Sequence, residues 1–263
     1  MHPSLLLVVI AGMVGTPLAA QRPGAPTRAD SVPHAVAIAL PRGERGHPIR
    51  WYEVGVAAAI VGGSMALDQP LERSLQRHRS SGKDDVASVF RRVGQPEVYG
   101  TVSLGLLGAG LLTGNHELAR AGGRAVGSLV LATVWMGGGK LVFGRARPYA
   151  SPDDAFQFHP LRGGEANQSF PSGHVTEAFT LATSLADDIH STPVQAGLYL
   201  VAAGTAWSRL NDDKHWLSDT VLGALVGITS AKLMDGHWRI FHLRPPRILL
   251  SPDAVGVEAS ASF

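Results

Sequence analysis

Three polar blocks interrupt a chain that otherwise consists of apolar stretches separated by Gly, Pro and short charged clusters. The first block spans residues 140–148, the second 169–174 and the third 208–219. Apolar stretches of helical length are stable in a folded domain when their apolar faces pack together. Each block lies at an end of such a stretch. We therefore expect an all-α fold, a bundle of about six core helices whose ends bring the three blocks to one site.

The positions of the helices follow from the apolar stretches and from the polar clusters that interrupt them. The charged segment Arg73–Lys83 is expected to be a surface connection. The segment Tyr149–Ser169, rich in Pro, Gly, Asp and Asn, predicts a long loop of the kind that often contacts substrate. The sequence predicts helices near residues 51–68, 84–93, 97–113, 117–144, 174–189, 193–209 and 216–235.

The chain divides into four segments. Residues 1–20 contain an apolar run that ends in small residues, as a secretory signal peptide does, although an uncleaved membrane anchor is an alternative because no Lys or Arg precedes the run. Residues 21–48, rich in Pro, Arg, Gly and Ala, predict a linker with one strand-like stretch. Residues 49–240 form the helical-bundle domain, and residues 241–263 form a tail with two strand-like stretches. The protein is expected to be exported.

Composition excludes several classes of protein. The chain has no cysteine, which excludes disulfides and thiolate metal sites. The formal charge of +2 excludes the strong positive field typical of nucleic-acid binding, so no nucleic acid partner is expected.

Whether the helices cross a membrane stays open at this point. The best apolar stretches, 54–67, 125–139 and 217–234, are slightly shorter than the roughly 20 residues that span a bilayer. Glu177 and the pair Asp187–Asp188 would be costly in lipid. Multi-pass insertion and a soluble or peripherally attached bundle are therefore both retained.

The first block pairs two cations. Lys140 and Arg147 are seven residues apart, close to two helical turns, so on one helix they would share a face before Pro148 ends it. A Lys point charge and an Arg fork can hold different oxygens of one phosphate. The alternative is a pair of cations that extend to solvent at a helix end. Arg145 is on another face and is assigned to this second class.

The second block shapes the start of a helix. Pro171, Ser172 and Gly173 predict a tight entry, after which the first backbone N–H groups of the helix point at an anion. The Ser172 hydroxyl adds a donor or caps the helix, and His174 is placed for proton transfer. An ordinary helix cap explains the same residues.

The third block supplies a His–Asp pair. His215 and Asp219 are four residues apart, so on a helix that begins near Lys214 they are neighbours. A carboxylate bonded to one imidazole nitrogen leaves the other nitrogen free as a nucleophile. Arg209, six residues before His215, can return to the same anion. A surface ion pair with an unrelated Arg is the alternative, and residues 212–214 are expected to be loop surface.

Taken together, Lys-x6-Arg-Pro, Pro-Ser-Gly-His and Ser-Arg-x5-His-x3-Asp resemble the three-part signature of the type 2 phosphatidic acid phosphatase and vanadium haloperoxidase superfamily. The resemblance covers roughly residues 95–235 and includes every defining residue. Val175 departs from it, because a small hydroxyl residue is frequent after the motif histidine.

The resemblance implies a role for each matching residue. His215 would attack phosphorus to give a phosphohistidine, Asp219 would orient it, and His174 would protonate the leaving group. The phosphoryl oxygens would be held by Lys140, Arg147, Ser172, Gly173 and Arg209.

The implied activity is a hydrolase of phosphoric monoesters or pyrophosphates, without metal or cofactor, on the outer side of the cell membrane or in the periplasm. Its partner would be a phosphorylated lipid or a small phosphoester. Two alternatives remain: a haloperoxidase, which would use vanadate, and a non-catalytic envelope protein that keeps the fold.

Overall fold

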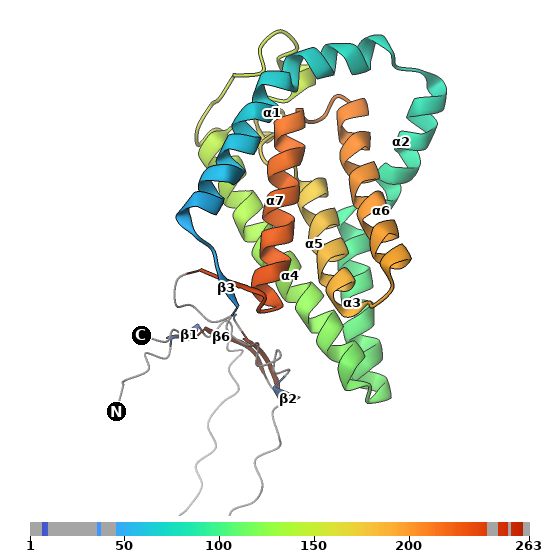
Figure 1. The fold of residues 1–263 in the computed structure, drawn as a ribbon, viewed down its shortest axis with the longest axis vertical. Coiled ribbons are helices and arrows are strands. Elements are labelled where there is room, and N and C mark those ends of the chain that lie inside the picture. Colours follow the sequence, from blue (N-terminus) through green and yellow to red (C-terminus); the bar gives the residue numbers. More distant parts are fainter. Residues whose placement is uncertain (1–6, 10–35, 38–45, 241–246, 252–253, 260–263) are drawn as a thin grey trace, which may run out of the picture.

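A computed structural model describes residues 7–9, 36–37, 46–240, 247–251 and 254–259. Within the range 46–240 the chain forms seven α-helices, which confirms the all-α bundle (Figure 1). Each of the seven helices corresponds to one of the seven ranges expected from the sequence, and most helix ends agree to within a few residues. The helices are α1 (Trp51–Arg77), α2 (Ser81–Val93), α3 (Pro96–Thr113), α4 (His116–Phe143), α5 (Gly173–Asp188), α6 (Thr192–Asn211) and α7 (Leu217–Met234).

Helix α5 is the central element of the bundle. It packs against α4, α6 and α7, while α1 covers α7, α3 lies along α4 and α2 lies along α6 (Figure 1). All three motifs lie at ends of α4, α5, α6 and α7, so this packing brings them together.

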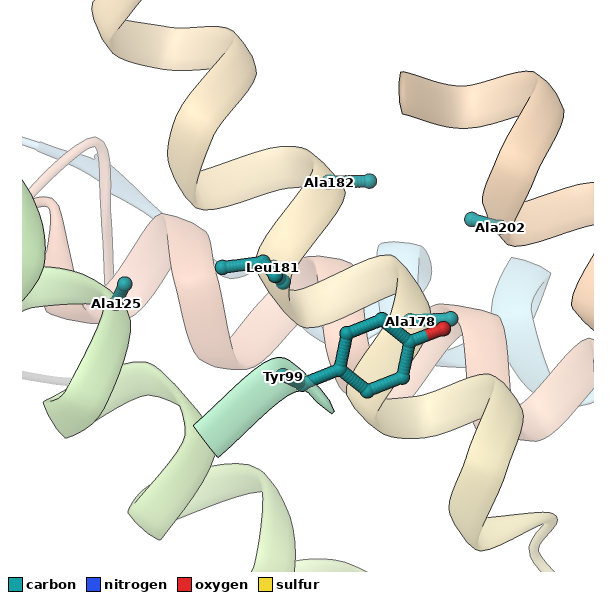
Figure 2. Close-up of a cluster of buried hydrophobic side chains, with 6 residues drawn as sticks. All are labelled: Tyr99, Ala125, Ala178, Leu181, Ala182 and Ala202. Atoms are coloured by element: carbon teal, nitrogen blue, oxygen red, sulfur yellow. The ribbon is translucent and has the colours of Figure 1, made fainter. Parts of the chain in front are cut away.

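The core beside α5 is built mostly from small side chains (Figure 2). Tyr99 is the largest member, and α5 contributes three residues to the cluster. Small side chains allow helices to approach closely, and the approach of α7 to α5 is so close that a Cβ on Gly227 would lie 2.4 Å from the Thr176 carbonyl oxygen. The other members of the cluster are Ala125, Ala178, Leu181, Ala182 and Ala202.

The expected surface connection at Arg73–Lys83 is wrong in extent. Helix α1 continues through Pro70 to Arg77, and α2 already begins at Ser81. Proline removes one helical N–H and normally ends a helix. Tertiary contacts hold α1 on both sides of Pro70: Asp68 bonds to α7, and the Gln76 side chain donates to the Leu210 carbonyl at 3.3 Å.

Short strands lie outside the bundle. Strands β1 (Leu7–Val9), β6 (Ala254–Ala259), β5 (Arg247–Ser251) and β2 (Val36–Ala37) form an antiparallel sheet in that order. The strand-like stretches expected in the linker and tail are thus confirmed at β2, β5 and β6. A parallel pair joins β3 (His47–Pro48) to β4 (Trp238–Arg239). Most of the expected signal peptide and linker lies outside the described residues.

Three helices, α1, α4 and α7, are long and apolar enough to cross a membrane. Large apolar side chains are exposed on α1, α3, α4 and α6, with Val134 and Leu200 65% and 69% exposed. Helix α1 extends beyond the expected range 51–68, because part of the charged segment that predicted a surface connection belongs to the helix.

Candidate active site

The first motif is divided between a helix and a turn. Helix α4 ends at Phe143, and Gly144 follows in the left-handed conformation with φ 55°. A Cβ at Gly144 would lie 1.8 Å from the His159 carbonyl oxygen, so only glycine fits there. Lys140 and Arg147 therefore do not share a helix face, and this part of the sequence argument is wrong.

Both cations nevertheless lie against the loop that precedes the second motif. The Lys140 ammonium donates to the Gln168 carbonyl at 2.6 Å, and Arg147 Nε donates to the Glu165 carbonyl at 2.9 Å. Because their partners are neutral carbonyls, both residues keep their positive charge available to an anion. The charges of both residues also contribute to lowering the pKa of His174, after burial as the main cause.

The second motif forms the start of α5 and also contacts the third. The Ser172 N–H donates to the Asp219 carbonyl at 3.0 Å, so α5 and α7 begin side by side. Ser172 occupies the N-cap position, but its hydroxyl does not cap the helix and is buried without a hydrogen-bond partner in the described part of the chain. A Cβ at Gly173 would lie 3.8 Å from Lys140 Cε, so the start of α5 faces the first motif.

In the third motif, His215 and Asp219 are both buried and lie at the start of α7. The helix begins at Leu217 rather than near Lys214, so His215 is in the preceding turn. His215 Nδ1 lies 2.8 Å from the Ser169 carbonyl oxygen and 3.5 Å from Asp219 Oδ2. A carbonyl oxygen can only accept, so Nδ1 carries the proton in this arrangement and Nε2 keeps its lone pair.

The Asp219 carboxylate is fixed by three hydrogen-bond donors. Oδ2 accepts from the Ser169 hydroxyl at 2.5 Å and from the Trp216 backbone N–H at 2.7 Å, and Oδ1 accepts from Arg145 at 2.7 Å. His215 Nδ1 lies 3.5 Å from Oδ2 and donates instead to the Ser169 carbonyl. Asp219 therefore lies in a set position beside the imidazole, and the Ser169 carbonyl orients the ring.

Arg145 was assigned to the solvent-exposed cations, and the structure corrects this. Its side chain has no exposed surface, and its guanidinium bonds to Asp219 Oδ1, Ser218 Oγ and Asp68 Oδ2 at 2.6–2.7 Å. The turn at Gly144 aims Arg145 inward, which no helical spacing could indicate. Its charge is compensated by two buried carboxylates, as a buried guanidinium requires.

Asp68 on α1 is a second residue that the sequence did not reveal. It is almost completely buried, and it accepts from Arg145 Nη2 at 2.7 Å and from the Ser218 N–H and hydroxyl at 2.8 and 2.6 Å. Asp68 lies about seventy residues before the first motif, and no local pattern marks it. It connects α1 to the support of Asp219.

Arg209, in the last turn of α6, is held by a residue expected to be loop surface. The Asp212 side chain is only 8% exposed, and it accepts from Arg209 Nη2 and from Arg91 Nη1, each at 2.7 Å. Burial lowers the pKa of Arg209, and its Nε is buried without a hydrogen-bond partner in the described residues. This unpaired donor and the Ser172 hydroxyl are suited to the oxygens of an anion.

The two histidines are neutral over a wide pH range. Burial lowers the pKa of His215 to about 4, against the opposing effect of Asp219. Burial lowers the pKa of His174 to about 3, and the charges of Arg209, Arg147 and Lys140, together with His215 when it is protonated, act in the same direction. Cations of the first and third motifs therefore act on the histidine of the second.

The loop of residues 149–169 lies over the third motif. Lys214 is stacked above the Tyr149 ring, with Nζ 4.5 Å from the ring centroid, and lies 3.7 Å from Glu165 Oε1. The Arg147 N–H donates to the Ala166 carbonyl at 2.8 Å. The loop is therefore attached to both sides of the site.

Comparison with known proteins agrees with this geometry. Residues 121–239 match the model of the PAP2 superfamily, and all eight predicted site residues lie in this range. This match covers slightly less than half of the chain, and it makes that part similar to the PAP2 superfamily, as the motifs indicated.

Two relatives can be described individually. Lipid A 1-phosphatase of Porphyromonas gingivalis is 35% identical over 126 residues, which are 46% of this chain and 25% of that protein. The chain thus matches about a quarter of the length of this relative. The crystal structure of Aquifex aeolicus LpxE is similar with a TM-score of 0.52 and 25% identity, over 63% of this chain and 92% of that one.

Proposed function

We propose that the protein is a metal-independent phosphatase that hydrolyses phosphorylated lipids through a phosphohistidine intermediate. The observation that carries this proposal is the orientation of His215. Ser169 and Asp219 occupy its Nδ1 side, so the lone pair of Nε2 is free to attack. A nucleophile of this kind needs an electron-poor centre, and the cations of the first and third motifs would hold a phosphoryl group there.

The first step forms a bond from His215 Nε2 to phosphorus and breaks the bond from phosphorus to the ester oxygen. His174 gives a proton to the departing oxygen, so an alcohol leaves. Its pKa of about 3 is that of the site without an anion. A bound phosphate brings negative charge, which raises the pKa of His174 and lets it carry the proton. In the second step water attacks phosphorus, His174 accepts the water proton, and inorganic phosphate leaves His215.

Charge on the phosphoryl oxygens increases during both steps, so fixed donors contribute most of the stabilisation. Arg209 Nε and the Ser172 hydroxyl are buried donors without partners in the described chain, and they would complete their hydrogen bonding on these oxygens. The Gly173 N–H at the start of α5 would add a backbone donor. Lys140 and Arg147 supply the remaining charge.

A lipid substrate is supported by the apolar exterior and by the relatives. Helices α1, α4 and α7 are of a length and composition that cross a membrane, and we propose that the protein is membrane-inserted with its site near one surface. Since one relative is a lipid A 1-phosphatase, a phosphate on a glycolipid is the first substrate to test. Export and an outward-facing site are part of this proposal.

The test is release of inorganic phosphate from purified full-length protein in detergent. Four substrates separate the substrate classes: lipid A, lysophosphatidate, undecaprenyl pyrophosphate and a soluble aryl phosphate. We expect the lipids to be preferred and His215→Ala to lower the rate by several orders of magnitude. Near-normal activity of His215→Ala would exclude the proposed nucleophile.

Vanadate separates the phosphatase from the haloperoxidase alternative. As a phosphate analogue it should inhibit phosphate release competitively. Halide oxidation by the vanadate-loaded protein with peroxide would instead favour the haloperoxidase.

A further inference from the structure

A second cluster of titratable residues lies where α5 and α7 both end, at the opposite end of these helices from the motifs (Figure 1). Asp187 is in the last turn of α5, Asp235 follows α7 directly, and His237 is two residues further. One ligand-type atom of each residue lies within 4.8 Å of those of the other two. The cluster is separated from His174 by most of α5, about 20 Å along a helix axis.

Asp235 is a buried carboxylate that lacks a donor. It is 6% exposed, and neither oxygen accepts a hydrogen bond from the described part of the chain. The nearest guanidinium nitrogen, Arg124 Nε, is 3.5 Å from Oδ1, while Arg124 Nη2 is bound to Asp188. A buried charge without a partner is strongly destabilising. A further positive group at this position would therefore stabilise the ionised Asp235 carboxylate.

The surrounding charges also favour a cation. The C-terminal end of a helix carries partial negative charge, which disfavours carboxylates and favours cations. Two helix ends meet here with three carboxylates, Asp187, Asp188 and Asp235, against the two cations Lys232 and Arg124. Lys232 Nζ is committed to Asp187, at 2.6 and 2.8 Å from its two oxygens. With all three carboxylates ionised, the cluster carries a net negative charge that a bound cation would compensate.

We propose that Asp187, Asp235 and His237 bind one divalent cation that joins the ends of α5 and α7. Two carboxylates and an imidazole suit Mn²⁺ or Zn²⁺ better than Ca²⁺ or Mg²⁺, which prefer oxygen ligands alone. His237 Nδ1 is 3.3 Å from Asp187 Oδ2, and its side chain is 57% exposed, so the ion has access from solvent.

The role of this ion is structural. His237 directly precedes β4, and β4 pairs with β3, the segment that leads into α1. A cation at this position would link the ends of α5 and α7 to the entry of α1. It has no part in the phosphoryl transfer proposed above, so binding is independent of whether that reaction is correct.

The experiment measures Mn²⁺ binding to the full chain, purified without a histidine tag and freed of metal with EDTA. Free Mn²⁺ is followed by electron paramagnetic resonance, and thermal unfolding is followed with and without the ion. We expect one Mn²⁺ per chain and a higher Tm when it is bound. Asp235→Asn should weaken binding at least tenfold. His237→Ala should do the same, and it keeps the test decisive should the buried variant not fold.

Asp188→Asn is the matched control, because it removes the same charge from the same helix end but none of the three ligand atoms. It should retain binding within a few-fold of the unaltered chain. Equal weakening in Asp188→Asn and Asp235→Asn would mean diffuse attraction and would overturn the ligand set. Absence of Mn²⁺ and Zn²⁺ binding at millimolar concentration would show that Lys232 and Arg124 are sufficient.

Discussion

At the scale of single residues, two arginines two positions apart have opposite surroundings. Arg145 is buried between Asp68 and Asp219, whereas the Arg147 guanidinium donates to the carbonyls of Glu165 and Lys214. Arg145 therefore supports the position of Asp219, whereas the charge of Arg147 stays available to an anion.

This contrast predicts different effects of Arg145→Met and Arg147→Met. Removing Arg145 leaves two buried carboxylates without their cation. We therefore expect Arg145→Met to lower the free energy of unfolding by about 3–5 kcal/mol and also to lose activity. Arg147→Met should lose activity with little change in stability. Chemical denaturation and phosphate release measure the two effects, and equal stability of both variants would contradict the assigned roles.

The proton-donor role of His174 predicts a dependence on the leaving group. An alkyl phosphate needs a proton on its departing oxygen, whereas a nitrophenolate leaves without one. His174→Ala should therefore slow an alkyl phosphate at least tenfold more than nitrophenyl phosphate, measured as kcat/KM for both esters. His215→Ala is the control and should lower both rates alike. A uniform loss in His174→Ala would assign His174 to binding instead.

The pKa of His215 predicts the acid side of the pH profile. Attack requires neutral imidazole, and burial lowers this pKa to about 4, so the nucleophile stays available as pH falls from 7 to 5. We expect kcat/KM to fall only below about pH 5, after correction for ionisation of the ester itself. Lys140 contributes to the lowering, so the residual activity of Lys140→Met should show its acid limb at higher pH. An acid limb centred near 6.5 in the unaltered protein is the contrary result.

At the scale of helices, the spacing of α5 and α7 sets the site. Gly223 and Gly227 lie at this contact, where Cβ atoms would come 2.8 and 2.4 Å from the Ser172 and Thr176 carbonyl oxygens. The same contact includes the hydrogen bond from the Ser172 N–H to the Asp219 carbonyl.

Gly227→Ala should therefore separate the helices and lower both activity and stability, the latter by a few kcal/mol, as overpacking does. Gly62→Ala on α1 is the control, because no other atom lies within 4 Å of a Cβ there. Alanine at that position should be neutral or slightly stabilising. Measured Tm and phosphate release distinguish the two, and similar values for both variants would exclude a role of the close contact.

The sequence predicted the helices well, because apolar stretches are local signals, and motif spacing placed all eight predicted site residues within the range of the family match. It failed where the chain leaves regular structure. The turn at Gly144 reverses the direction of Arg145, and His215 precedes α7 instead of lying on it. Asp68 was missed because its partner, Arg145, is distant in the sequence. Asp212 was missed because its contact with the charged Arg91 depends on how the helices pack.

At the scale of the whole molecule, the distribution of apolar side chains predicts location. Exposed Val, Leu and Trp residues on α1, α3, α4 and α6 would be costly in water as one large surface. We expect the protein to remain in the membrane fraction after washing with alkaline carbonate. Fractionation with an antibody against the chain measures this, and release into the supernatant would favour the soluble or peripheral bundle.

The contact of Asp68 with Arg145 and Ser218 has a consequence for where the catalytic unit begins. The family match starts at residue 121, yet the carboxylate that completes the support of Asp219 lies on α1. A fragment cut at the start of the match would contain every motif residue and leave Arg145 short of one counter-ion. The smallest piece that can be transplanted or redesigned as a working unit therefore has to include α1, although no motif lies there.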